Sequence, residues 1–296
     1  KVLLRKAAEE HQRGVRLFDV WKVMPYRDSF SPQLQSTFWF EGSSSSYMPQ
    51  MLRGKVPLYI VGGWRDELRD QGFIAQMNVP GSRIVGGDWL PCENDVFALA
   101  QEAHRFFARH LKGIDTGIDQ DPPIHYFVVG ANGGKGEWRS AQSWPLADAR
   151  PVQFAFTATG LKEGSAVDRG FARTFPVDYG VNCKDGGVGP VMQPCHIAGQ
   201  GASVTGKPLA AASEFTGHAV ADIWISVPST DANLFLYVED VAPDGTVRVV
   251  TEGRLKASLR KLGQAPWQLP NIPWHRAFAE DAQPLKPGEP VRLQFD

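Results

Sequence analysis

The chain has 296 residues, and its 31 Lys and Arg residues nearly balance 32 Asp and Glu residues, giving a formal net charge of −1. A balanced charge without runs of one sign excludes the basic faces that bind nucleic acid or anionic membranes, so we expect neither partner. Hydrophobic residues make up 43% of the chain, and no apolar stretch approaches the length of a membrane span. Length and composition therefore predict a soluble, globular protein of about two domains.

Three cysteines, Cys92, Cys183 and Cys195, cannot all pair within one chain. Cys183 and Cys195 flank a Gly/Pro-rich loop, and the sequence leaves open a local disulfide or two free thiols. No Cys or His spacing fits a zinc site, so we expect no metal and no cofactor. The compartment and any homo-oligomerisation stay open.

The first segment, residues 1–54, is predicted to be mixed and mainly helical. A nearly continuous apolar run, Val56 to Val61, then ends in Gly62-Gly63, which is typical of a strand buried on both faces of a parallel sheet. A helical stretch follows over residues 67–76. A second short strand, residues 83–85, ends at Gly86-Gly87.

The clearest helix begins after Asn94, a good N-cap, and carries apolar residues at helical spacing until Gly113 closes it. The order strand, helix, strand, helix over residues 55–122 predicts the C-terminal part of an open α/β sheet. In such sheets the chemistry lies in loops at the carboxyl ends of the strands, here 62–66 and 86–92.

Beyond the linker the hydrophobic period changes to two. Residues 152–156, 222–227 and 234–238 alternate, and the last run leads through the tight turn Ala242-Pro-Asp-Gly245 into a returning strand. Residues 123–296 are therefore predicted to form an all-β sandwich, most plausibly a jelly roll. The fold class expected is α/β followed by all-β.

Asp66, in Gly62-Gly-Trp-Arg-Asp66, is the most informative residue. An Asp just past a buried strand is where an α/β hydrolase holds the acid that orients its catalytic His, although a helix-capping Asp fits the same local pattern. The next loop, 86–92, ends in Pro91-Cys92 and contains no His. A Cys cannot replace a His as general base at neutral pH, so Cys92 is predicted to be a loop thiol.

No Gly-x-Ser-x-Gly nucleophile elbow occurs anywhere in the sequence. The histidines also favour structural roles: His104 and His110 fall on the helix that Gly113 closes, and His125, His218 and His275 fall in or beside predicted strands. From the residues alone, the chain is an α/β fragment joined to a β-sandwich, with one suggestive acid.

Several segments nevertheless resemble one family in the right order along the chain. They are Met24-Pro-Tyr-Arg-Asp28, Thr37-Phe-Trp-Phe40, Gly62-Gly-Trp-Arg-Asp66, Gly130, Trp138-Arg139, Trp144-Pro145, Pro208-Leu209, Thr216-Gly-His218, Asp240-Val-Ala-Pro-Asp-Gly245, Thr251-Glu-Gly253 and Pro273-Trp-His-Arg276. The sequence resembles the cocaine esterase / X-prolyl dipeptidyl-peptidase family of serine hydrolases (peptidase family S15), which includes α-amino acid ester hydrolases and glutaryl acylases.

The resemblance implies the C-terminal part of an α/β-hydrolase domain with a helical cap segment (1–54 and 55–122), followed by the jelly roll (123–296). Asp66 is the one triad position that carries over. The family's nucleophilic Ser lies upstream of the cap, within which this chain begins. Its Gly-Pro-Trp-x-His motif corresponds to Gly87-Asp-Trp-Leu-Pro91, which places Pro91 or Cys92 where the His belongs.

Two functions remain open at this point. The first is a serine hydrolase that cleaves a small ester, amide or peptide through an acyl-enzyme, with Asp66 fixing the tautomer of the His. Trp64 and Trp89 flank the two loops and are candidates to line the acyl pocket, with core packing as the alternative. The second function is a catalytically inactive homologue or fragment that binds a ligand.

Overall fold

The structure is a computed structural model that describes residues 2–66, 69–90, 97–131, 134–165, 171–180 and 201–296. Its contacts divide the chain into two compact units. The first unit combines residues 1–54, 220–235 and 254–296, and the second combines residues 55–219 and 236–253. The second unit contains both loops in which the sequence places the chemistry.

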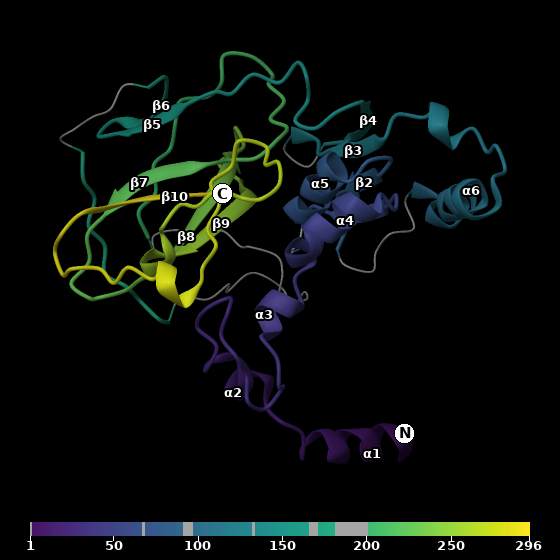
Figure 1. Cartoon of the computed structure of the whole chain (residues 1–296). Helices are drawn as coiled ribbons and strands as arrows, with labels where there is room; N and C mark the ends of the chain where they lie inside the picture. The colour runs from purple at the N-terminus through teal and green to yellow at the C-terminus, as the bar shows by residue number, and fades with distance from the viewer. Residues whose placement is uncertain (1, 67–68, 91–96, 132–133, 166–170, 181–200) are drawn as a thin grey trace. The chain divides into compact units, whose positions relative to one another are not determined.

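A four-stranded sheet forms the frame of the second unit, in the order β1 (Tyr59–Gly63), β2 (Arg83–Gly87), β3 (Ile124–Val128) and β4 (Glu137–Ala141). The pairs β1–β2 and β2–β3 are parallel, and β3–β4 is antiparallel (Figure 1). The predicted parallel α/β arrangement is therefore confirmed. The sheet also crosses the predicted boundary between residues 122 and 123, because β3 and β4 extend it.

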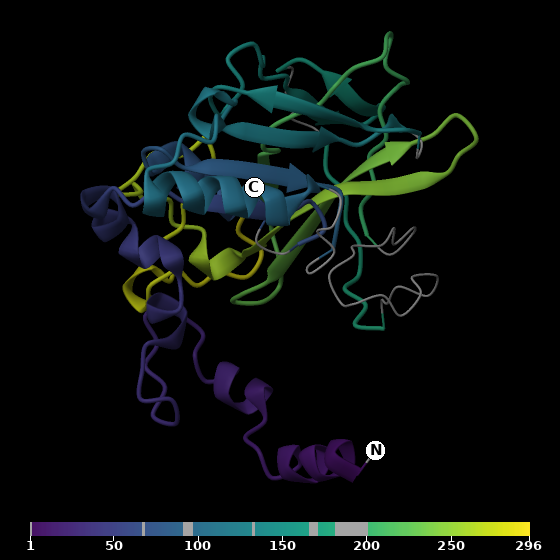
Figure 2. The same ribbon diagram turned by 90° about the vertical axis from the view of Figure 1, so that its right-hand side faces the viewer.

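Two helices cover opposite faces of this sheet. Helix α5 (Arg69–Asn78) packs on the face of Ile60 and Ile84, because its Gly72 leaves room for both side chains. Helix α6 (Leu99–Lys112) lies on the other face, where the rings of Phe106 and Tyr59 are 5.6 Å apart (Figure 2). The core on the α5 side consists of Phe73, Ile84, Ile124, Tyr126 and Trp144.

Helix α6 ends as the sequence predicts, at Gly113. The φ of Gly113 is +67°, a left-handed conformation that favours glycine, and its N–H donates to the Arg109 carbonyl. Its start differs from the prediction: the helix begins at Leu99, after Ala98 in a left-handed conformation (φ +46°), and not directly after Asn94. Residues 91–96, which include Asn94 and the candidates Pro91 and Cys92, lie outside the described residues.

Polar side chains join α6 to the strands beneath it. The Tyr59 hydroxyl donates to Glu102 at 3.1 Å, and Arg105 bonds both Glu102, at 2.8 Å, and Asp121, at 2.6 Å. Burial raises the pKa of the Tyr59 phenol well above its ordinary value, and the Glu102 carboxylate reinforces the shift. Burial also lowers the pKa of His125 on β3, and the Arg83 guanidinium lowers it further.

The remaining described strands pair two by two. Strand β5 (Phe154–Thr157) pairs antiparallel with β6 (Gly160–Glu163), β7 (Ala221–Ile225) with β10 (Val291–Phe295), and β8 (Asn233–Val241) with β9 (Val247–Lys256). The predicted turn joins β8 to β9, and its Gly245 N–H donates to Ala242. This β-rich region agrees with the period-two pattern, while the jelly roll stays a prediction. Cys183 and Cys195 lie outside the described residues.

The first unit ties the cap-like segment to the C-terminal segment. The Arg27 N–H donates to the Ala277 carbonyl, and the Ala279 N–H donates to Asp28 Oδ1, each at 2.9 Å. The rings of Phe40 and Phe278 meet edge to face. These contacts join two of the family-like segments. Met24–Asp28 bonds to residues that come shortly after Pro273–Arg276 in the sequence.

The helices and 3₁₀ turns outside the sheet are short. They are α1 (Val2–His11), α2 (Leu17–Trp21), α3 (Phe38–Glu41), α4 (Met48–Gly54), η1 (Ser44–Tyr47), η3 (Ile118–Gln120), η5 (Ala257–Leu259) and η6 (Ala279–Asp281). Within the described ranges, no helix combines the length and the apolar character that crossing a bilayer requires.

The lowered pKa of His125 makes the stability of the second unit sensitive to acid. The unfolded chain takes up a proton near the ordinary His value of about 6.5, before the folded chain does, so acid favours unfolding. We expect the free energy of unfolding to fall as the pH drops through the ordinary His value of about 6.5 and below it. His125→Gln should flatten this slope in denaturant titrations, whereas the same change at the exposed His104 should not. Equal slopes in all three proteins would contradict the prediction.

Candidate active site

Two loops continue from the carboxyl ends of β1 and β2, which end side by side because Gly63 pairs with Gly87. The ladder continues for one more bond, from the Trp64 N–H to the Gly87 carbonyl at 2.8 Å. The chain then turns, and the Asp66 N–H donates to the Gly63 carbonyl at 3.1 Å. Asp66 therefore stands on a tight turn at the sheet edge where α/β folds carry their chemistry.

The Trp64 side chain is half-buried against the sheet. Its indole N–H donates to the Phe127 carbonyl at 2.8 Å, and its ring stacks on Phe73 with centroids 5.6 Å apart. Gly86 makes this possible, because a Cβ there would lie 2.7 Å from the Trp64 ring. These contacts are those of core packing, and the proposed role in the acyl pocket stays a prediction.

Trp89 lies within the second loop and is 5% exposed. Its ring lies so close to Gly87 that a Cβ there would approach to 2.0 Å, and a Cβ on Gly63 would lie 2.5 Å from the Trp89 carbonyl oxygen. Trp138 on β4 packs beside it. Three of the four glycines thus leave room for the two tryptophans that the sequence singled out: Gly86 for Trp64, and Gly63 and Gly87 for Trp89.

Between these tryptophans, the two loops are joined by an ion pair. Arg65 Nε donates to Asp88 Oδ1 at 2.6 Å, and Arg65 Nη2 donates to Asp88 Oδ2 at 2.8 Å. Sequence reasoning missed this pair, because the two residues are 23 positions apart and meet only through the register of β1 and β2.

The start of α5 has polar neighbours as well. Arg69 donates to the Trp64 carbonyl at 3.4 Å and to the Glu252 carbonyl at 3.3 Å. Asp70 lies 3.4 Å from His218 Nδ1, and His218 Nε2 accepts a hydrogen bond from the Trp144 indole at 2.9 Å. Both nitrogens of His218 face partners in the second unit, so the structural role predicted for His218 is confirmed.

The structure brings Asp66, Trp64 and Trp89 to neighbouring loops. Pro91 and Cys92, where the resemblance places the family's His, lie outside the described residues. Among the described residues, no three His, Cys, Asp or Glu side chains gather in a way that could hold a metal ion.

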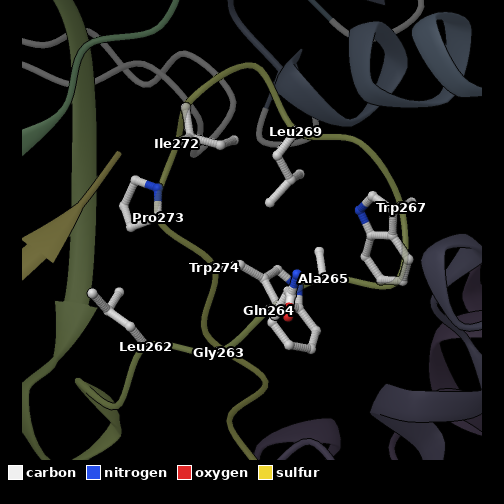
Figure 3. Close-up of a pocket in the computed structure, with 9 residues that line it drawn as sticks. All are labelled: Leu262, Gly263, Gln264, Ala265, Trp267, Leu269, Ile272, Pro273 and Trp274. Atoms are coloured by element: carbon white, nitrogen blue, oxygen red, sulfur yellow. The ribbon is translucent and has the colours of Figure 1, made fainter.

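A separate pocket of about 330 Å³ lies in the first unit, within residues 262–274. Figure 3 shows its mainly apolar lining, which includes Trp267, Leu269, Ile272 and Trp274 together with the polar Gln264. The two indoles stand almost perpendicular, at 82°. No charged side chain lines this pocket.

Comparisons with known proteins agree with these features. Residues 116–296 match the family described as the X-Pro dipeptidyl-peptidase C-terminal non-catalytic domain. The match covers more than half of the chain. The chain belongs to the cocaine esterase / X-prolyl dipeptidyl-peptidase family.

Individual relatives extend the likeness upstream of the matched domain. Proteins of Mycobacterium bovis and Mycobacterium tuberculosis, each named "putative serine esterase", are 31% identical over 280 residues, 86% of this chain. Cocaine esterase of a Rhodococcus species is 26% identical over 243 residues, 70% of this chain. The chain spans 44% and 42% of the lengths of these relatives, respectively.

A solved structure gives the same fold. The crystal structure of a CocE/NonD family hydrolase from Staphylococcus aureus aligns with 95% of this chain and 48% of its own length, with a TM-score of 0.56. At 15% sequence identity this likeness concerns the fold alone. The chain thus has the fold of the C-terminal part of such a hydrolase.

The close packing of the Trp89 ring on Gly87 can be tested by substitutions within the two Gly-Gly pairs. Gly87→Ala should lower the free energy of unfolding by about 1–3 kcal/mol, because the new methyl group overlaps the Trp89 ring. Gly62→Ala is the matched control, since nothing lies within 4 Å of its added Cβ, and it should change stability by less than about 0.5 kcal/mol. Denaturant unfolding of both variants measures the difference. Equal effects of the two substitutions on the free energy of unfolding would contradict the close packing of Trp89 on Gly87.

Proposed function

We propose that this chain is the part of a serine hydrolase that supplies the triad acid, Asp66, for cleavage of an ester or amide through an acyl-enzyme. The observation that carries the proposal is the place of Asp66 on the turn after β1, at the carboxyl edge of a parallel sheet, in a member of a family with named esterases. The substrate would be a small ester, amide or peptide.

In this mechanism Asp66 does not take up the proton. Its carboxylate accepts a hydrogen bond from the ring N–H of a catalytic His, which fixes the tautomer and stabilises the charged ring as the His takes the proton of the Ser. The Ser oxygen attacks the carbonyl carbon, the alcohol or amine leaves with that proton, and water then releases the acid. This sequence supplies the Asp, while neither the Ser elbow nor a His in the expected loop can be identified in it.

A second candidate is a catalytically inactive homologue that binds a ligand. Two features favour it: the resemblance places Pro91 or Cys92 where the family's His belongs, and the first unit has a mainly apolar pocket of about 330 Å³ lined in part by Trp267 and Trp274. A protein that lacked both Ser and His would have little of the rate enhancement that a triad provides.

A fluorophosphonate probe separates the two candidates. The probe phosphonylates an activated Ser, and intact mass spectrometry of the purified protein then shows one added group. We expect one adduct on the longest form of the protein that its source expresses. A protein without adduct would favour the ligand-binding alternative.

Asp66→Asn tests the role of the acid directly. The amide cannot hold the His in the required tautomer, so turnover of an ester such as p-nitrophenyl acetate should fall on the order of 10²–10⁴-fold. The measurement needs the longest form of the protein that its source expresses. Asp70→Asn is the control, because it removes the same charge from the same segment. Unchanged turnover in Asp66→Asn would remove Asp66 from the triad.

A further inference from the structure

We infer that Arg65 and Asp88 are positioning residues that fix the turn of Asp66 relative to the loop after β2. This inference rests on the function proposed above and deepens it. The pair, here named the Arg65–Asp88 clamp, joins the loops just beyond the last backbone bond of the β1–β2 ladder, between Trp64 and Gly87.

The geometry of the clamp fixes orientation as well as distance. Two parallel hydrogen bonds of 2.6 and 2.8 Å hold the planar guanidinium against the carboxylate. Such a fork restricts rotation of both groups, which a single ammonium contact would not do. Because Trp64 is anchored in the core on one side of Arg65 and Asp66 follows on the other, the clamp restrains the backbone from which the Asp66 side chain projects.

Exposure argues that the clamp contributes more to positioning than to stability. The side chains of Arg65 and Asp88 are 46% and 24% exposed, and ion pairs this accessible add little to folding. A displacement of about 1 Å in a catalytic group, by contrast, can lower a rate about 100-fold. The clamp therefore matters far more for a reaction at Asp66 than for the melting temperature.

The test uses Asp88→Asn, which keeps the size of the side chain, and Arg65→Lys, which keeps its charge. Each variant loses the pair of parallel hydrogen bonds between the guanidinium and the carboxylate. In the longest expressed form, kcat for p-nitrophenyl acetate should fall about 10- to 100-fold with KM within about twofold. Exchanging the two residues, Arg65→Asp with Asp88→Arg, should restore most of the loss. About 1 M NaCl screens exposed charges over about 3 Å, so it should slow the wild type more than Asp88→Asn.

A matched control exists in the first unit. Arg292 and Asp222 form the same fork between β10 and β7, with bonds of 2.8 and 2.5 Å, and their side chains are 52% and 44% exposed. Asp222→Asn removes an equivalent ion pair from a different sheet. It should leave kcat and its salt dependence unchanged.

Amide hydrogen exchange provides a readout that does not need activity. In Asp88→Asn, the Asp66 amide should exchange at least about tenfold faster, while amides of α6 keep their rates. Unchanged exchange at Asp66 would overturn the clamp, and faster exchange with an unchanged kcat would overturn its positioning role. A wild-type protein without esterase activity would remove the proposed function instead, and exchange alone would then decide whether the clamp holds the turn.

Discussion

The parallel ladder between β1 and β2, ending in two glycine pairs, is the constraint on which the candidate site depends. Because Gly63 lies opposite Gly87, both loops leave the sheet at the same level, and the missing side chains leave room for the Trp64 and Trp89 rings. These rings fix the loops from the core side. The outward residues between them, Arg65 and Asp88, are thereby brought within hydrogen-bonding distance.

The local features of this frame could be predicted because they depend on residues close in sequence. The apolar run before Gly62 predicted a strand, which β1 forms, and Gly113 predicted the end of α6. The predicted burial on both faces was wrong, because β1 is the first strand in the order of the described sheet and Val61 is 42% exposed. The limits were less accurate, since β1 begins at Tyr59 rather than Val56. The apolar pattern that begins at Val56 is the same whether or not its first residues pair with a neighbouring strand. It therefore could not predict where β1 begins.

The features that escaped prediction depend on pairing between distant strands. Strand β3 lies after a linker, and nothing in its sequence indicates that it joins β2 in parallel, so the expected domain boundary fell before it. The ion pair of Arg65 and Asp88 likewise requires the register of β1 and β2. The position of Asp66 could be predicted because a strand and its following turn are one local unit, whereas its role rests on family resemblance.

The bonds that join Asp28 to Ala279 and Arg27 to Ala277 also have a consequence for biosynthesis. Asp28 and Ala279 are 251 positions apart, so this part of the first unit cannot close until almost the whole chain has left the ribosome. Contacts of such long range close slowly, because the entropy of the intervening chain must first be lost. Until then the Phe40 ring lacks its partner Phe278, so this apolar surface stays uncovered during synthesis.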